Sequence, residues 1–564
     1  MLNKKKWKKI FIYSSASIVL LIAIFVIYFK FAVTINPPLI DDFSPLNKKR
    51  IQVNKYFYKI DNNWIKKNKY GLWELYVEGD PFKRGVIFGK LSQELMYRQE
   101  SDLIKQINKM IPSVYYLNII KLFVAWFNKD LDSYIDNEYL KEIYGVSQSA
   151  SHQFDYIASG YQRILNYHAA HDIGHALQGM HIIGCTSFSA WGNKSYDGNL
   201  IVGRNFDFYV GDDFAQNKIV AFINPSNGYK FMMVTWGGMI GVVSGMNEKG
   251  LTVTLNAAKS EIPLSAATPI SIVAREILQY AKNINEAYSI ATKHKVFVSE
   301  SIMIGSLEDN KTVIIEKTPS ETDLYSRDDN YIICTNHYQG EKLKNSKLNI
   351  ENKNESASLY RFNRVAELMN VYPKISYKNA AAILRDQKGI ANADIGMGNE
   401  KVINQLIAHH SIIFEPAKKL VWVSSNPYQL GAYVAYDLNK VFSSPGAVFN
   451  NPVLNEESLT ISPDTFLTSI NYIKFERYKE IKKTIKKYLS SDSIKTLDKS
   501  LLNEFVLCNP DYYDVYSLLG DYYKKNNDYA NAIVNYKKAL TKEVPTLKEA
   551  NAVRVRLNKC LNHR

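Results

Sequence analysis

The longest apolar run of the chain lies close to its N-terminus. Residues Ile10 to Phe29 contain no charge, and five lysines precede them. At ~1.5 Å of rise per residue, a helix of this length spans about 30 Å, the thickness of a bilayer core. The lysines predict that the N-terminus stays in the cytoplasm, so the rest lies on the extracytoplasmic side, which is periplasmic in a Gram-negative cell. We therefore expect residues 1–33 to form a single-pass membrane anchor.

A cleaved signal peptide is the alternative interpretation of this run. The apolar stretch is long for a signal peptide, and no small-residue cleavage motif follows it before Thr34. The pattern therefore favours an anchor that is retained.

Residues 34–184 show two kinds of pattern. Residues 34–69 contain Pro37 and Pro38 and little periodicity, which predicts a linker. Residues 70–184 are mainly helical in pattern, and the helical repeat is clearest from Asp80 onward, where Pro81 follows at a helix start.

The pattern changes to short β-rich runs after residue 184. The runs are NLIVGRNFDF, NKIVAFINP, YKFMMVTWGG and GLTVTLNAA. A helix should follow, with Thr268 as its N-cap and Pro269 at its first position. Strands return near residues 301–338, a helix near 358–370 and a strand pair near 409–425. Residues 185–440 are therefore expected to form one layered α+β domain.

The remaining residues read as a linker, 441–461, and a helical tail, 462–564. Ser462 is expected to cap the first helix of the tail, with proline at the next position. Part of the tail is similar to a tetratricopeptide repeat, although Pro545 comes one residue late. The alternative is an ordinary helical hairpin. The residues at the repeat's spacing are Tyr516, Leu519, Gly520, Tyr523, Ala532, Tyr536 and Ala539.

Composition narrows the class of protein. With 564 residues, of which 46% are hydrophobic, the chain is too long for one core, so several folded domains are expected. The net charge of +15 comes from scattered lysines without a basic and aromatic cluster, so nucleic acid is not an expected partner.

The cysteines and histidines do not indicate a metal site. Cys334, Cys508 and Cys560 accompany Cys185, and no pair has the spacing of zinc ligands. Four cysteines in so long a chain are not a disulfide scaffold; Cys508 and Cys560 could pair, but isolated thiols are favoured. His168, His171 and His175 have helical spacing, which we interpret as a polar helix face because no matching carboxylates accompany them.

Cys185 stands in a context that suggests catalysis. It directly follows Gly184, and Arg204 and Asp207 lie in the strand-like run that comes next. A thiol that performs acyl transfer needs a base, and an N-terminal cysteine carries one in its own α-amine, whose pKa is about 8. A cysteine within the chain reaches that state only if the bond before it is cut, and glycine at that point gives the thiol access to the carbonyl. Arg204 could stabilise the thiolate, and Asp207 could orient the new ammonium group.

The motifs CTSF, GNLIVGRNFDF and GMNEKGLTVTLNAA resemble those of N-terminal-nucleophile hydrolases. The best match is to the self-cleaving, penicillin acyltransferase-like branch, which is related to choloylglycine hydrolases and to acid ceramidase-like amidases. The resemblance covers about residues 70–440. It implies a four-layer αββα sandwich with a helical propeptide before the nucleophile. A tetratricopeptide-like tail would follow that sandwich.

The resemblance also implies a set of site residues. Cys185 matches the nucleophile, with autocleavage between Gly184 and Cys185, and Arg204 and Asp207 match the residues beside it. Asn256 and Asn336 match asparagines on the oxyanion side. Arg361 matches a late active-site arginine, although Arg364 is close enough to confuse the choice. Trp191 and Trp236 are candidate walls of the substrate pocket.

The implied activity is hydrolysis or acyl transfer at a non-peptide amide bond through a thioester on Cys185. The expected substrate is a small N-acyl amide, a class that includes lipid-like acyl amides, and no metal or organic cofactor is expected. The tail could bind a protein partner. Two other classes stay open: a non-catalytic exported scaffold that works through its tail, and a lipid-binding protein at the membrane surface.

Overall fold

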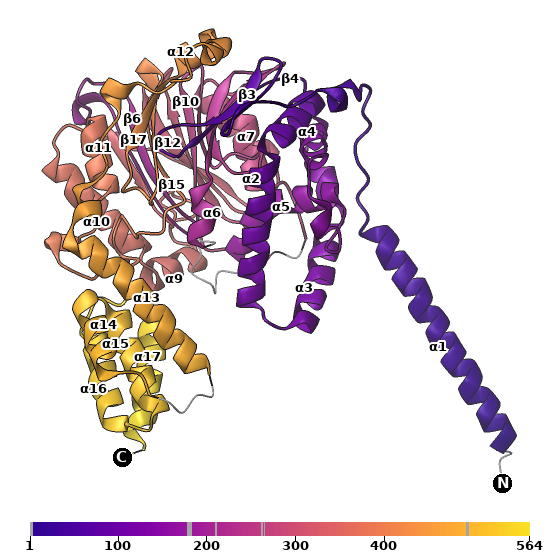
Figure 1. Ribbon diagram of the computed structural model, residues 1–564, viewed down its shortest axis with the longest axis vertical. Coiled ribbons are helices and arrows are strands. Elements are labelled where there is room, and N and C mark those ends of the chain that lie inside the picture. The colour runs from indigo at the N-terminus through magenta and orange to yellow at the C-terminus, as the bar shows by residue number, and fades with distance from the viewer. Residues whose placement is uncertain are drawn as a thin grey trace.

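A computed structural model describes residues 4–176, 183–208, 211–260, 263, 265–491 and 496–563. Helix α1 (Lys4–Ala32) contains the expected apolar run, and its residues Trp7–Ala32 are long and apolar enough to cross a membrane. Figure 1 shows α1 extending away from the rest of the molecule, with only its C-terminal end close to it. An N-terminal apolar helix is therefore present, and by itself it could serve as an anchor or as a signal sequence.

Two β-sheets form the centre of the molecule. The larger sheet has the strand order β1-β2-β3-β4-β7-β8-β9-β10-β11-β12-β13, and the smaller has the order β14-β5-β6-β15-β16-β17. The strands of the larger sheet are β1 (Ile51–Asn54), β2 (Phe57–Ile60), β3 (Asn63–Lys67), β4 (Trp73–Gly79), β7 (Ile219–Pro225), β8 (Phe231–Thr235), β9 (Ser244–Asn247), β10 (Leu251–Ala257), β11 (Glu300–Ser306), β12 (Lys311–Lys317) and β13 (Thr322–Tyr325). Those of the smaller sheet are β5 (Ile183–Ala190), β6 (Ile201–Phe208), β14 (Tyr331–Cys334), β15 (His410–Glu415), β16 (Leu420–Ser424) and β17 (Tyr433–Asp437).

Three apolar cores hold these layers together. One core joins the two sheets to each other, and includes Val202 from β6 and Phe222 from β7. A second lies between the larger sheet and a group of helices, and a third between the smaller sheet and another group. The first group is α2 (Pro81–Met110), α4 (Asn137–Ser147), α5 (Gly160–Ala176), α7 (Ile270–Tyr280) and α8 (Ile284–Lys293); the second is α10 (Ser358–Val371) and α11 (Tyr377–Leu384). The expectation of a mixed α+β fold is confirmed.

The segment expected to be a linker contains three strands of the larger sheet. Strands β1, β2 and β3 occupy residues 51–67, and β4, expected within a helical region, pairs in parallel with β7. In β3, Trp64 and Ile65 are both buried because the sheet is covered on both faces. A strand of this kind has no alternation of apolar and polar residues, so the pattern did not reveal it.

Two expected helix starts are also wrong. One helix begins one residue later than expected, and the other begins several residues later. Helix α7 begins at Ile270 with Pro269 as its N-cap, and the Thr268 hydroxyl donates to the Tyr134 carbonyl instead of capping the helix. The first tail helix, α13 (Ile470–Ser490), is capped by Ser469 rather than Ser462, because a short 3₁₀ turn at residues 465–468 comes between them.

The tail consists of α13, α14 (Lys499–Cys508), α15 (Tyr513–Lys525), α16 (Tyr529–Leu540) and α17 (Leu547–Leu561). Gly520 of α15 faces the ring of Tyr536 of α16, and a Cβ at that position would come within 2.5 Å of the ring. Glycine therefore allows the two helices to pack closely. A tetratricopeptide repeat remains a prediction for this hairpin.

The tail and the sandwich share a core. Leu406, Tyr428 and Leu430 of the sandwich pack in the same buried cluster as the tail helices. Asn509 fixes the contact, because its side chain accepts from the Met397 N–H at 3.0 Å and donates to the Met397 carbonyl at 2.9 Å. Figure 1 shows the tail, in yellow, below the sandwich.

Candidate active site

Cys185 lies in β5, between the two sheets. Strand β5 pairs antiparallel with β6, so that Cys185 lies opposite Phe206 and Ser187 opposite Arg204. Ser187, which shares the face of Cys185, donates to the Asn256 side chain on β10 of the larger sheet at 2.8 Å. The side chains of this face therefore point toward the facing sheet.

The thiol of Cys185 is fully buried beside a guanidinium. The Arg204 Nη2 lies 3.7 Å from the sulfur. Burial raises the pKa of the thiol to about 11, although Arg204 opposes the shift. In the uncut chain the sulfur is therefore protonated at neutral pH and needs a base before it can act as a nucleophile.

Arg204 is held rigidly from the larger sheet. Its Nη1 donates to the Val243 carbonyl at 3.0 Å, and it also contacts Ser244 and the Leu255 carbonyl. Ser244 is in turn within 2.8 Å of the His410 Nε2. This network fixes the positive charge next to the sulfur.

Asp207 lies opposite Gly184 in the same strand pair and is fully buried. Its Oδ2 accepts from the Gln405 Nε2 at 3.3 Å, and its Oδ1 has no hydrogen-bond partner in the part of the chain that the structure describes. Burial raises the pKa of Asp207 to about 7, although Arg361 and Arg204 oppose the shift. The carboxyl can therefore change its protonation state close to neutral pH.

Gly184 has little room on its side-chain face. A Cβ at this position would lie 2.9 Å from the Gln405 Nε2. Gln405 thus touches both the residue before Cys185 and the carboxylate opposite it.

Asn336 and Arg361 hold the backbone of Cys185. The Cys185 N–H donates to the Asn336 Oδ1 at 3.1 Å, and the Arg361 Nη2 donates to the same oxygen at 2.6 Å. The Arg361 Nη1 donates to the Cys185 carbonyl at 2.5 Å and to the Thr186 hydroxyl at 2.8 Å. Arg364 instead pairs with Asp386 at 2.9 Å, so of the two arginines Arg361 is the one at Cys185.

The side-chain N–H groups of the two asparagines point to backbone carbonyls. The Asn336 Nδ2 donates to the Ala257 carbonyl at 2.9 Å. The Asn256 Nδ2 donates to the carbonyls of Cys334 and Thr335 at 2.9 and 3.2 Å. Asn336 therefore meets the Cys185 nitrogen through its oxygen, whereas Asn256, on β10 of the facing sheet, contacts Ser187 instead.

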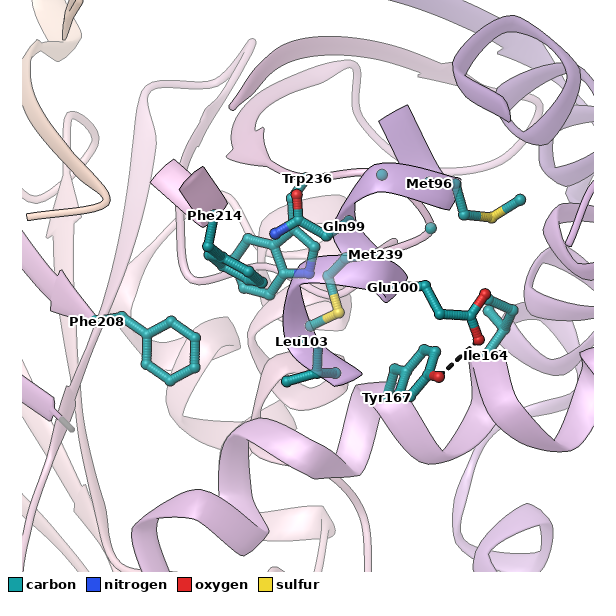
Figure 2. A pocket seen from close by; sticks show the side chains of 12 residues that line it. Met96, Gln99, Glu100, Leu103, Ile164, Tyr167, Phe208, Phe214, Trp236 and Met239 are labelled. Carbon is teal, nitrogen blue, oxygen red and sulfur yellow. Dashed lines mark hydrogen bonds between the residues drawn. The ribbon is translucent and has the colours of Figure 1, made fainter. Parts of the chain in front are cut away.

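A mostly apolar cavity of about 80 Å³ lies beside the site (Figure 2). Phe208 forms part of its wall and stacks on Phe206, the residue opposite Cys185, at 5.5 Å between ring centroids. The lining residues are Met96, Gln99, Glu100, Leu103, Ile164, Tyr167, Phe208, Phe214, Trp236, Gly237, Gly238 and Met239. Trp236 is thus a wall residue, whereas Trp191 packs in the core between the sheets.

The described residues contain no group of three or more His, Cys, Asp or Glu side chains that could hold a metal ion. His168 is fully buried, and burial lowers its pKa to about 4. Its Nδ1 donates to the Ile164 carbonyl at 2.8 Å and its Nε2 accepts from the Ile240 N–H at 3.0 Å, so it has a structural role. The side chains of His171 and His175 lie outside the described residues.

Two residues at the site were not expected from the sequence. Ser358 accepts from the Asn336 N–H at 2.8 Å, and Gln405 contacts Asp207 and Gly184. Ser358 lies one helical turn before Arg361, so its position on the same helix face was a weak sequence signal that it belongs to the site. Gln405 lies in a loop with no motif.

The sequence is similar to known acyl-transferring proteins over part of its length. The family model of acyl-coenzyme A:6-aminopenicillanic acid acyl-transferase matches residues 193–427, which include Arg204, Asp207, Asn256, Asn336 and Arg361 and begin after Cys185. An uncharacterized protein of Archaeoglobus fulgidus is 24% identical over 251 residues. That alignment covers 42% of this chain and 41% of the relative, so the chain spans less than half of the relative's length. The family match supports similarity at the level of the N-terminal-nucleophile hydrolase superfamily.

Two solved structures are similar over less than half of the chain. One is the N-acylethanolamine-hydrolyzing acid amidase ortholog of Caenorhabditis elegans, at 17% identity and a TM-score of 0.30, covering 41% of this chain and 93% of that one. The other is a mutant conjugated bile acid hydrolase from Clostridium perfringens, at 14% identity and a TM-score of 0.30, covering 45% and 93%.

Proposed function

We propose that this protein is a membrane-anchored amidohydrolase or acyltransferase that activates itself by cutting the Gly184–Cys185 bond. The observation that carries the proposal is the surroundings of that bond. Asn336 and Arg361 hold the nitrogen and carbonyl of Cys185, Arg204 lies at its sulfur, and Asp207 lies opposite Gly184. A structural cysteine requires none of these partners.

Self-cleavage would proceed by an acyl shift from nitrogen to sulfur. The Cys185 sulfur attacks the Gly184 carbonyl carbon, the C–N bond breaks, and the leaving nitrogen gains a proton to become the α-amine. Water then hydrolyses the thioester, which frees the Gly184 carboxylate and the thiol. Asp207 pairs with Gly184 and so lies on the other face of the strand from the sulfur; ionised, it could accept the thiol proton through one water, since its pKa of about 7 suits a general base at neutral pH.

In turnover the new α-amine would serve as the base. It accepts the thiol proton, the sulfur attacks the substrate carbonyl to form a thioester, and the amine donates a proton to the leaving amine. Water or an acceptor amine then resolves the thioester. The contact of Asn336 with the Cys185 nitrogen favours a role in orienting the amine. To donate to the oxyanion, Asn256 would have to exchange one of the two contacts of its Nδ2, to the carbonyls of Cys334 and Thr335, for the substrate oxygen.

The cavity supports a substrate with an apolar acyl part. Phe208, Phe214 and Trp236 line it, and it adjoins the ring opposite Cys185. An acyl chain in this cavity would place its carbonyl toward the sulfur. We infer that the substrate is an N-acyl amine or N-acyl amino acid, lipid-like where the chain is long.

The order of the layers supports the four-layer αββα arrangement. The three apolar cores join, in turn, a layer of helices to the larger sheet, the larger sheet to the smaller sheet, and the smaller sheet to a second layer of helices.

Helix α1 is proposed as the anchor, with the catalytic part outside the cytoplasm. A reporter fused after residue 440 should then behave as exported; activity confined to the cytoplasm would contradict this topology. The tail is proposed as a tetratricopeptide-like surface for a protein partner.

Intact-mass analysis with N-terminal sequencing tests the proposal. The purified protein should consist of two chains, residues 1–184 and 185–564, that stay together because the helices before Cys185 share a core with the larger sheet. The second chain should begin Cys-Thr-Ser-Phe. An active enzyme that remains one uncut chain would overturn the mechanism, and an uncut chain whose thiol resists acyl probes would favour the scaffold alternative.

A further inference from the structure

Helix α3 (Val114–Phe127) exposes a continuous apolar face. Phe127 is the one residue of this helix that is buried. Tyr115, Ile119, Leu122 and Trp126 follow each other at helical spacing and form a single stripe, in which Tyr115 is 77% exposed. The exposed large apolar residues of the helix are Val114, Tyr115, Tyr116, Ile119, Leu122, Phe123 and Trp126. A patch of this kind usually marks a contact with another surface.

The apolar surface continues onto the end of α2. Ile107 and Met110 are also exposed, and α2 and α3 meet at a bend of 120°. By length and composition this bent pair could enter a membrane. Figure 1 shows both helices projecting from the sandwich, on the side where α1 lies.

Helix α3 contacts the end of the proposed anchor. Phe29 of α1 stacks on Trp126, with 5.8 Å between ring centroids and 15° between ring planes. Just beyond α1, the Val33 carbonyl accepts from the Gln162 Nε2 of α5 at 2.6 Å. A bilayer that contains α1 would therefore reach α3.

We propose that α3 and the adjoining end of α2 insert into the outer leaflet of the bilayer that α1 crosses, an inference that rests on the proposed anchor. Tyr115, Tyr116 and Trp126 suit the boundary between headgroups and acyl chains. Lys109 is exposed near this face and can reach anionic headgroups with its charged end, whereas the Nζ of Lys121 donates to the Tyr156 carbonyl. The occupant of the face is thus lipid.

This placement would connect the bilayer with the cavity. Leu103 lines the cavity, and Ile107 and Met110 follow it along the same face of α2. Ile164 and Tyr167 of α5 form the neighbouring wall (Figure 2). An apolar acyl chain could pass from the leaflet along this stripe without crossing bulk water.

Photolabelling from within a bilayer tests the proposal. The full-length protein would be reconstituted in nanodiscs that contain phosphatidylcholine with a diazirine in one acyl chain, and labelled peptides would be mapped by mass spectrometry. Label is expected in residues 7–32 and in residues 107–127. Label confined to residues 7–32 would overturn the inference, whereas absence of label from both would contradict the anchor itself. Because no turnover is measured, neither result depends on the proposed catalysis.

A paired variant separates lipid from protein as the occupant. Tyr115→Asp with Leu122→Asp should reduce the label in residues 107–127 at least about tenfold, because buried aspartate is costly in lipid. Val534→Asp, at a residue 63% exposed in the tail, should leave it unchanged. Circular dichroism would verify that both variants fold. Cross-linking of α3 to a second copy without lipid label would show that a protein covers this face and overturn the proposal.

Discussion

Cys185 and Cys334 lie on neighbouring strands of the same sheet and are both fully buried, yet their surroundings differ. Burial raises the pKa of both thiols, that of Cys185 to about 11 and that of Cys334 well above its ordinary value. Cys185 faces Arg204, whereas Cys334 packs in the core between the sheets, with its sulfur 3.8 Å from the Thr335 carbonyl. Burial alone therefore does not distinguish a candidate nucleophile from a packing residue; the charged partners do.

The sharpest test of this comparison replaces each cysteine in turn. Cys185→Ala should leave one uncut chain and reduce amidase activity by on the order of 10⁶-fold, the loss found when a hydrolase nucleophile is removed. Cys334→Ser should be cut normally, because its sulfur has no role in the mechanism. Mass spectrometry and turnover of an N-acyl amide provide the readouts. Normal cutting of Cys185→Ala would mean that another group performs the cleavage.

Removing the carboxylate should give the next largest effect. Asp207→Asn should slow self-cleavage by roughly 10²- to 10⁴-fold, the usual contribution of a general base. In the unaltered chain the rate should rise with pH through about 7, because the carboxyl must lose its proton to act. Stopped time courses of the precursor between pH 5 and 9 measure this. A rate without a midpoint near pH 7 would exclude Asp207 as the base. The asparagine variant should lose that midpoint, because only the thiol, whose pKa is about 11, then titrates.

The same carboxyl affects stability with a defined sign. Because its pKa rises from 3.8 to about 7 on folding, it stabilises the folded precursor at low pH, and this contribution is lost as the pH rises to about 7. Faster cutting and lower precursor stability should therefore appear together.

Opening the cavity should weaken selectivity for long acyl chains. Trp236→Ala should lower kcat/KM for a long-chain N-acyl amide by about tenfold or more, because a wall of the proposed acyl site is lost. Self-cleavage should be unaffected, and Trp191→Ala serves as the matched control at a tryptophan outside the cavity. Equal losses for short and long chains would show that the cavity does not bind the acyl part.

Gln405→Ala should have a smaller effect. The Gln405 amide donates to Asp207, so its loss should raise the pKa of the carboxyl by a fraction of a unit and slow cutting at neutral pH a few-fold. The midpoint of the pH profile should move upward, and Gln405→Glu should move it further by adding a like charge. An unchanged midpoint in both variants would assign Gln405 to packing alone.

The smallest effect should be that of Cys334→Ser on stability. A hydroxyl in this apolar core costs roughly 1–3 kcal/mol unless it finds a partner. Denaturant unfolding of the Cys185→Ala precursor with and without this change measures it. A stabilised double variant would contradict the assignment of Cys334 to the core.

The sequence allowed prediction of the elements with strong periodicity or special residues. Three features follow from local patterns alone, and tertiary contacts do not change them. They are the apolar helix α1, the helix after Pro81 and the change to strands after residue 184. Strands β1 to β3 were not predicted. Strand β3 is buried on both faces, which removes the alternation of apolar and polar residues that identifies a strand.

The site was predictable where a motif carried it. Arg204 and Asp207 follow Cys185 closely in the chain, and the strand pair brings them to it. The choice between Arg361 and Arg364 needed the helix to be placed against β5, because both residues are buried and three positions apart. Gln405 reaches Asp207 from a loop far along the chain, a contact that no local pattern encodes.

The pair of hydrogen bonds between the Asn509 side chain and the Met397 backbone has a consequence for how the chain could have evolved. The tail buries Leu406 and Leu430 of the sandwich, and the loop of residues 396–406 that it covers leads to Gln405. A lineage that lost or exchanged the tail would expose apolar surface and loosen a segment that contacts the Asp207 carboxyl. Exchange of the tail for another helical segment would therefore require matching changes in that loop.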